Sequence, residues 1–182
     1  MARSSLLRSL ALAVALGPGS MGAWACTVEG PPAGEAPPPR AAAAPAASSS
    51  RPDFVPAGPG EVEPVVRQAL TAATAEQRRL VIYVGATWCE PCQAFHHAVE
   101  RGELDEALAG VRFLEFDSDH DGARLQAAGY GGRLIPRFVV PAADGRGSKD
   151  RMEGGIKGDG AVAHIMRRLG PLLDSTEASS TS

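Results

Sequence analysis

Two cysteines with two residues between them form the clearest chemical feature of the sequence, the motif Trp88-Cys89-Glu90-Pro91-Cys92. A thiol pair at this spacing can close into a disulfide and reopen by thiolate attack, without any other cofactor. The motif leads into a segment with helical character, and the unpaired N–H groups and dipole of a helix N-terminus favour a thiolate there. We therefore expect thiol–disulfide exchange, with Cys89 as the attacking nucleophile and Cys92 as the resolving thiol.

Two other roles for the cysteine pair remain open, a purely structural disulfide and a metal site. His96 lies four residues after Cys92, so the two could share one helix face and form a ligand set with Cys89. A zinc site needs four ligands at compatible positions, however, and Trp88 and Pro91 are better explained by thiol chemistry. We therefore expect no resident metal, and we expect the two adjacent histidines to be surface residues of the helix.

The first 25 residues have the three-part pattern of an export signal. Arg3 and Arg8 form a basic start, residues 10–16 form an apolar stretch, and residues 23–25 offer a small-x-small cleavage pattern. The apolar stretch is too short for an ordinary membrane span. We therefore expect an extracytoplasmic protein, periplasmic or secreted, in a compartment where disulfides persist.

Cys26 directly follows the predicted cleavage site, at the position of the acylated cysteine in a lipoprotein. A lipobox prefers Leu or Val where Ala23 stands, and Trp24 is bulky for the next position. Both outcomes therefore stay open: a lipid on Cys26 that tethers the chain to a membrane, or ordinary cleavage that leaves a free cysteine. The range 26–60 is rich in Pro, Ala and Ser and predicts a disordered linker.

The expected fold follows from the helical and strand patterns after residue 60. Apolar residues recur at helical spacing over 61–78, and residues 80–84 are a continuous apolar, β-prone run typical of a strand covered on both faces. Helices that alternate with strands before a terminal hairpin predict an α/β fold, a small mixed sheet with helices on both faces. One domain over 61–173 and a disordered tail over 174–182 follow. The other expected elements are helices over 91–100, 103–109 and 123–128, strands over 111–116 and 137–140, a hairpin partner near 151–154, and a last helix from residue 162 that Gly170-Pro171 stops.

Several ligand classes are disfavoured by the composition. The net charge is −3 and the chain has no basic run, so it has no electrostatic footprint for nucleic acid or for anionic lipid. The run Asp117-x-Asp119-x-Asp121-Gly122 resembles the start of a calcium loop. The glutamate expected at the twelfth position is replaced by Ala128, so we expect a solvated loop at a strand end.

The stretch VIYVGATWCEPCQAF resembles the strand, tryptophan and active-site helix of the thioredoxin superfamily. The resemblance covers about residues 61–173. The pair Ile135-Pro136 follows Cys92 by about 44 residues, where the superfamily carries its cis-proline loop opposite the cysteines. The resemblance implies a thioredoxin-like fold, a cis Pro136 and an Ile135 backbone that pairs with an extended substrate segment. The substrate-binding residues that it implies are Trp88, Glu90, Pro91, Ile135 and Pro136.

Within the superfamily, the stretch from FHHAVERGELDEAL to VRFLEFD is similar to the C-terminal domain of transmembrane thiol–disulfide interchange reductases. The Cys-Glu-Pro-Cys motif also resembles extracytoplasmic reductases that serve cytochrome c maturation. These resemblances imply a reductase of exported protein thiols and disulfides, recharged by an electron donor in a membrane. A disulfide oxidase or isomerase remains open, and so does a non-catalytic module that binds a partner or delivers a metal such as Cu(I).

The sequence departs from the superfamily at Tyr83, six positions before the first cysteine. Thioredoxins carry a buried acidic residue at this place, where it helps to deprotonate the resolving thiol. Proton transfer in this chain must therefore use water or another group. The carboxylate of Glu90, next to Cys89, opposes the effect of the helix end on the thiolate through like-charge repulsion.

Overall fold

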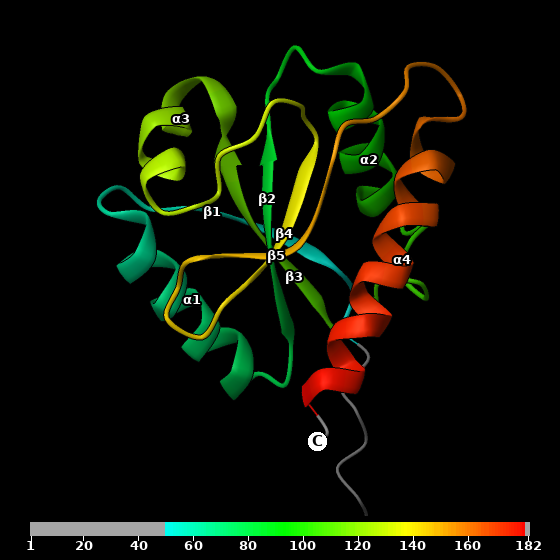
Figure 1. The fold of residues 1–182 in the computed structure, drawn as a ribbon. Coiled ribbons are helices and arrows are strands. Elements are labelled where there is room, and N and C mark those ends of the chain that lie inside the picture. The colour runs from blue at the N-terminus through cyan, green and yellow to red at the C-terminus, as the bar shows by residue number, and fades with distance from the viewer. Residues whose placement is uncertain (1–49, 181–182) are drawn as a thin grey trace, which may run out of the picture. The chain divides into compact units, whose positions relative to one another are not determined.

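The computed structural model describes residues 50–180, with side chains up to residue 175. The predictions for the export signal, for Cys26 and for most of the linker lie outside the described residues. Within them, five strands form one sheet in the order β1-β3-β2-β4-β5 (Figure 1). The elements are β1 (Asp53–Pro56), α1 (Val62–Ala75), β2 (Arg79–Gly85), α2 (Glu90–Glu100), β3 (Val111–Asp117), α3 (Ser118–Ala127), β4 (Arg137–Pro141), β5 (Gly147–Glu153) and α4 (Ala161–Ser180).

Two apolar layers cover the sheet, one on each face. Along β2, Val81 and Tyr83 pack with α2 and α4, whereas Ile82 and Val84 pack with α1 and α3. Successive side chains of a strand point to opposite faces, so a strand buried on both sides must be apolar throughout. Figure 1 shows the same arrangement, with α1 and α3 on one side of the sheet and α2 and α4 on the other. The predicted α/β fold, a mixed sheet with helices on both faces, is confirmed.

The sheet is mixed because its two halves connect differently. The strands β1, β3 and β2 run parallel, whereas β4 is antiparallel to β2, and β5 is antiparallel to β4. Since β2 and β3 end at the same edge, with Gly85 opposite Asp117, the cysteine motif after β2 lies close to the start of α3. The parallel register thus brings two segments together that are about 30 residues apart in the chain.

The structure corrects the predicted boundary between linker and domain. Residues 53–56, which the sequence places in a disordered linker, form the edge strand β1, with Asp53 opposite Arg112 on β3. Phe54 stacks on Phe113, with 5.0 Å between the ring centroids. The strand has four residues and ends in a proline, whose missing backbone N–H costs little on an edge strand. The residues around β1 are rich in proline, and this composition led to the prediction of a linker.

The structure also corrects the end of the last helix. Helix α4 continues through Gly170 and Pro171 to Ser180, where the sequence predicts a stop and a disordered tail. Pro171 removes one backbone hydrogen bond, but Leu169 and Leu173 are both buried in the core, one turn apart. The guanidinium of Arg79 also donates to the carbonyl of Leu173 at 2.7 Å. Burial of this face and the added hydrogen bond outweigh the helix-breaking tendency of the pair.

The structure also differs from the prediction at residues 103–109 and at the start of the terminal hairpin. Residues 103–109 form turns and not a helix, although Leu104 and Leu108 are buried. Gly102 and Gly110, on either side, both have positive φ, which leaves too few residues between them to sustain helical hydrogen bonding. The hairpin partner β5 begins earlier than predicted, at Gly147.

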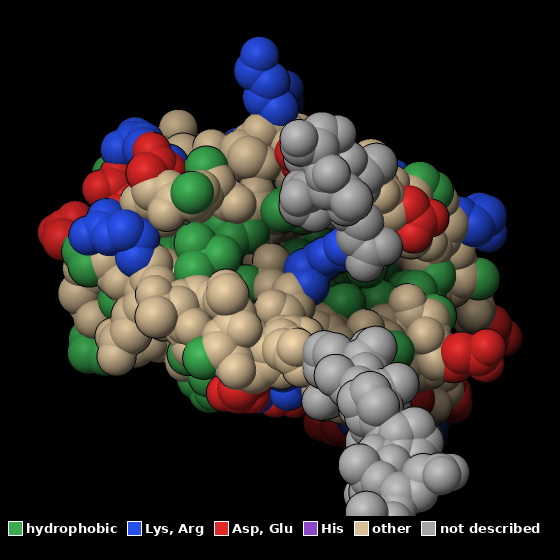
Figure 2. Space-filling view, turned by 90° about the horizontal axis from the view of Figure 1, so that it is seen from below, with side chains coloured by type: hydrophobic (Ala, Val, Ile, Leu, Met, Phe, Trp, Pro, Cys, Tyr) green, Lys and Arg blue, Asp and Glu red, His purple; other side chains and the backbone are tan. Residues whose placement is uncertain are grey.

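The surface of the described part carries charges of both signs. On the end of the molecule seen from below in Figure 2, acidic and basic side chains are interspersed around hydrophobic hollows. Among residues 50–180, no helix has the length and apolar character needed to cross a membrane.

Candidate active site

The cysteine pair lies at the start of α2. Cys89 occupies the N-cap position, Pro91 lies in the first turn, and Cys89 and Cys92 form a disulfide with their Cα atoms 5.2 Å apart. The backbone of Cys89 is anchored on both sides: its N–H donates to Ala86 at 3.1 Å, and its carbonyl accepts from Gln93 at 3.0 Å. Both cysteines are buried in this disulfide form. A sulfur atom in this place is close to the unpaired N–H groups of the helix N-terminus.

A proline loop lies against the cysteine motif. The Ile135–Pro136 peptide bond is cis, and Ile135 packs against the core cluster that contains both cysteines. A Cβ added at Gly155 would lie 2.9 Å from Cβ of Pro91 and 3.4 Å from Cδ of Pro136. The two prolines and the backbone of Gly155 therefore meet at one point, beside the disulfide.

This close approach predicts the effect of a methyl group at Gly155. We expect Gly155→Ala to lower the free energy of unfolding by about 1 kcal/mol and to slow disulfide exchange, because the loop must move away from the motif. Thermal unfolding and the rate of reduction of a small disulfide measure the two effects. Gly58→Ala is the matched control, since a Cβ there has no neighbour within 4 Å. Equal stabilities and equal reduction rates of the two variants would show that the close contact between Gly155 and the prolines does not constrain the loop.

An ion pair between a buried guanidinium and a partly exposed carboxylate holds the proline loop in place. Nε of Arg137 donates to Glu153 at 3.2 Å, and its other nitrogens donate to the carbonyls of Tyr130 and Leu134 at 2.9 and 3.1 Å. The same carboxylate of Glu153 accepts from the backbone N–H of Arg133 at 3.1 Å. Sequence analysis missed this pair. Its signal was an arginine in an otherwise apolar strand, and the hairpin register places it opposite the glutamate.

The ionisation of Glu153 links this pair to pH. Burial alone would raise the pKa of Glu153, but the hydrogen bonds from Arg137 and from the backbone of Leu134 and Arg133 hold that pKa below its usual range. A carboxyl whose folded pKa is lowered stabilises the fold above its unfolded pKa of about 4.5, and this contribution is lost as the pH falls through the folded pKa.

We therefore expect a pH-dependent difference between the wild type and Glu153→Gln. At neutral pH the variant should be less stable by about 1 kcal/mol, because it loses a charge-assisted hydrogen bond that is partly exposed to solvent. At a pH below the unfolded pKa of Glu153, the difference in the free energy of unfolding between the two proteins should become smaller. Urea unfolding at neutral and acidic pH measures it, and Glu106→Gln, at an exposed position, should show no such change.

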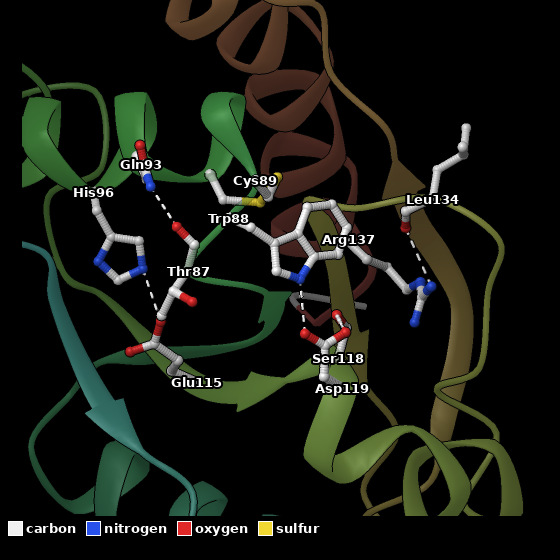
Figure 3. Close-up of a disulfide and its surroundings, with 11 residues drawn as sticks. Thr87, Trp88, Cys89, Gln93, His96, Glu115, Ser118, Asp119, Leu134 and Arg137 are labelled. Carbon is white, nitrogen blue, oxygen red and sulfur yellow. Dashed lines mark hydrogen bonds and ion pairs between the residues drawn. A yellow bond between two sulfur atoms is a disulfide. The ribbon is translucent and has the colours of Figure 1, made fainter.

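Trp88 projects into solvent beside the disulfide and is 67% exposed. Its indole N–H donates to a carboxylate oxygen of Asp119 at 2.7 Å (Figure 3). Asp117 caps α3 by accepting from the backbone N–H groups of Asp119 and His120. Asp121 accepts from the backbone N–H of Asp117. The acidic run thus begins a helix and orients the tryptophan, and the expected solvated loop is corrected because Asp117 supplies an N-cap.

Glu90 is engaged by the loop before α4. Its carboxylate accepts a hydrogen bond from the backbone N–H of Gly158 at 2.8 Å. Part of its negative charge is therefore directed at a backbone donor, which moderates the repulsion expected between Glu90 and a thiolate at Cys89.

The two histidines of α2 differ in their surroundings. His97 is exposed as expected, but His96 is half-buried, stacked on Phe54 with ring centroids 3.8 Å apart. Its Nε2 lies 2.8 Å from a carboxylate oxygen of Glu115. The expectation of a surface histidine fails at His96 because β1, which supplies Phe54, was not predicted.

In the part of the chain that the structure describes, no cluster of three or more His, Cys, Asp or Glu side chains could hold a metal ion.

Known proteins were compared with this chain by sequence and by structure. A thioredoxin of Aspergillus fumigatus is 36% identical over 92 residues, which cover 50% of this chain and 77% of the relative. A thioredoxin structure from Trichomonas vaginalis has 23% identity and a TM-score of 0.45, and covers 66% of this chain and 96% of its own. A mutant thioredoxin from Halobacterium salinarum has 26% identity and a TM-score of 0.43, and covers 71% and 93%. No protein-family model matches the chain.

The relationship to the Aspergillus protein extends over more than two thirds of that relative. It confirms the superfamily that the cysteine motif and its surroundings resemble. Thiol–disulfide redox chemistry by a redox-active disulfide, with no external cofactor, follows for the chain at the level of the family. The Cys89–Cys92 pair, at disulfide distance, is the pair available for it among the described residues. The chain belongs to the thioredoxin family.

Proposed function

We propose that the chain catalyses dithiol–disulfide exchange on exported proteins, and that it works as a reductase. The observation that carries the proposal is the Cys89–Cys92 disulfide at the N-terminus of α2, beside the Pro136 loop. A helix N-terminus stabilises the thiolate that must attack. The export signal and the resemblance to interchange reductases support the compartment and the direction.

The exchange proceeds in two steps that balance in atoms and electrons. The thiolate of Cys89 attacks one sulfur of a substrate disulfide, a mixed disulfide forms, and the second substrate sulfur leaves as a thiolate. Cys92 then attacks the sulfur of Cys89, which closes the disulfide of the chain and releases the first substrate sulfur. The substrate disulfide is reduced by two electrons and the cysteine pair is oxidised by two.

The surroundings of the pair offer a surface for an extended polypeptide. Trp88, Leu134 and Ile156 are the large hydrophobic residues that the described surface exposes most. Trp88 and Leu134 lie on the same side of the site in Figure 3. We expect the backbone of Ile135 to pair with the substrate segment, as an added strand would, and the apolar side chains to contact its residues. Glu90 is exposed beside this surface, whereas Pro91 and Pro136 are buried beneath it and shape it from below.

The proposed reductase needs an electron donor and a location. A donor in a membrane would return two electrons to the Cys89–Cys92 disulfide after each turnover. The residues before the domain support export, and a lipid on Cys26 would hold the domain near such a donor through the linker. Labelling with a radioactive or alkyne-tagged fatty acid tests this tether, and Cys26→Ser should abolish the label.

The reduction potential of the pair tests the direction. We would equilibrate the full chain carrying Cys26→Ser against glutathione or dithiothreitol buffers and measure the oxidised fraction. A potential near about −270 mV supports a reductase, whereas one near about −120 mV would make the chain an oxidase. Failure to find any reversible two-electron couple would remove the exchange proposal.

A second candidate function is a binding or metal-delivery module on the same fold. The observation that favours it is the neutral, buried Tyr83 at the position where thioredoxins carry an acid. Titration of the reduced chain with Cu(I), followed by thiol alkylation, separates the two functions. Stoichiometric protection of both cysteines, together with an absent redox couple, would support the module.

A further inference from the structure

A groove of about 750 Å³ reaches the inner cysteine of the pair. Cys92 lines it together with Tyr83, Gly85, His96 and Glu115, which come from β2, α2 and β3. The resolving step requires Cys92 to lose its proton, because only the thiolate attacks a disulfide. A group that faces the same groove can take this proton through water.

Tyr83 is the most buried polar group on this groove, but it cannot be the base. Its hydroxyl is buried and has no hydrogen-bond partner among the described residues. A Cβ added at Gly85, which also lines the groove, would lie 2.6 Å from that oxygen. Burial, and secondarily the negative charge of Glu115, raise the pKa of Tyr83 far above its usual range. The hydroxyl therefore stays protonated and cannot take the proton of Cys92.

The pair formed by His96 and Glu115 lies on the same wall of the groove, between two aromatic rings. Nε2 of His96 lies 2.8 Å from Oε1 of Glu115, and both side chains are partly open to solvent. Phe54 stacks on one face of the imidazole at an interplanar angle of 15°. The ring of Tyr83 approaches it edge-on, at 5.2 Å between centroids. In Figure 3 this pair lies on one side of the turn before Cys89, and Trp88 with Asp119 lies on the other.

The other titratable groups on the groove either form hydrogen bonds or ion pairs of their own or lie on its exposed rim. Asp117 caps α3, and Asp121 pairs with Arg124 at 2.9 Å. His97 and Glu100 are exposed on α2. The His96–Glu115 pair is therefore the half-buried proton acceptor that shares the groove with Cys92.

We propose that the His96–Glu115 pair accepts, through water in the groove, the proton that Cys92 loses when it resolves the mixed disulfide. The inference rests on the proposed exchange function. The proton moves from the sulfur of Cys92 to a water molecule, and a proton of that water moves to the pair. The thiolate of Cys92 then attacks the sulfur of Cys89, the bond between Cys89 and the substrate breaks, and the substrate sulfur leaves with the electron pair. The pair later returns its proton to solvent or to the departing thiolate.

The two steps can be timed separately with 5,5′-dithiobis(2-nitrobenzoate) in a stopped-flow instrument. Attack by Cys89 releases one thionitrobenzoate and leaves a mixed disulfide, and attack by Cys92 releases the second. The reduced full chain with Cys26→Ser is the reference. Glu115→Gln keeps the shape of the side chain, and His96→Phe keeps an aromatic ring against Phe54. The matched control is His97→Gln, at the next, exposed position of the same helix.

We expect both groove variants to slow the second phase about tenfold or more, as loss of a general base does, and to leave the first phase unchanged. The rate of the second phase should also become a simple function of thiolate ionisation, with a steeper rise between about pH 6 and pH 9 than in the reference. His97→Gln should change neither phase. As a further check, free imidazole should restore the second phase in His96→Ala.

Second-phase rates and pH profiles that match the reference in both variants would overturn the proton-acceptor role while leaving exchange intact. A slowed second phase whose pH profile is unchanged would also overturn it, because it would show that the pair acts only through packing. A reference chain that shows no first phase would instead overturn the proposed exchange function. Circular dichroism and thermal unfolding check that each variant is folded.

Discussion

Replacement of Cys92 with alanine should arrest the exchange at the mixed disulfide. Cys89 can still attack, but release of the adduct then depends on a thiol from solution. We expect the lifetime of the adduct to increase about a hundredfold or more, because the resolving attack loses its intramolecular advantage. Non-reducing electrophoresis and mass spectrometry of the Cys26→Ser, Cys92→Ala chain, incubated with an oxidised model peptide, measure the adduct and its decay.

Cys89→Ala is the matched control for this trap. It removes the cysteine at the helix N-cap, the proposed nucleophile, and leaves Cys92 inside the first turn of α2, so we expect no adduct on the same time scale. Adduct formation by Cys89→Ala but not by Cys92→Ala would reverse the assigned roles. Rapid, equal turnover by both variants would show that the chemistry lies elsewhere in the chain.

Replacement of Arg137 with methionine should cause the largest loss of stability among the changes near the site. The guanidinium is almost completely buried and bonds Glu153 and the carbonyls of Tyr130 and Leu134. Its removal leaves a partly buried carboxylate without its cation. We expect the free energy of unfolding to fall by about 3 kcal/mol, the low end for a broken buried pair, because Glu153 remains partly open to solvent. Urea unfolding followed by circular dichroism measures the change.

Arg133→Met is the control for the arginine substitution. This arginine lies in the same loop but is exposed, so its replacement should change stability by less than about 0.5 kcal/mol. The double variant Arg137→Met, Glu153→Leu removes both charges and should recover part of the loss. Equal losses in Arg137→Met and Arg133→Met would refute a stabilising role of the buried pair. A loss in exchange rate beyond that explained by unfolding would show that the pair also positions the proline loop.

The Pro136 loop and the cysteine motif illustrate how much of the site is visible in the sequence. The spacing of the cysteines, the proline that follows one of them in the first helical turn and the apolar run of β2 are local signals. Local signals of this kind depend on backbone propensity and hydrophobic periodicity, which neighbouring residues determine. For this reason the α/β class was predicted from the sequence. The thioredoxin superfamily was predicted from the resemblance of the motif and the Ile135-Pro136 pair, and both predictions are confirmed.

The residues that surround the motif were not visible in the same way. His96 is a half-buried partner of Glu115 because Phe54, about 40 residues earlier, supplies the ring beneath it. Asp119 bonds Trp88 because β2 and β3 end at the same edge of the sheet. Each of these contacts joins segments distant in sequence, so no local pattern announces it.

The sequence by itself determined the cysteine motif, the helix that follows it and the central strand before it, since these depend on residue type and short-range periodicity. Only the tertiary structure decided where the folded domain begins and where its last helix ends. The edge strand β1 exists because β3 offers an unpaired edge, and α4 continues past Pro171 because Leu173 gains a buried position. In both places the free energy of long-range packing outweighs an unfavourable local propensity, and that packing becomes available only when the sheet has formed.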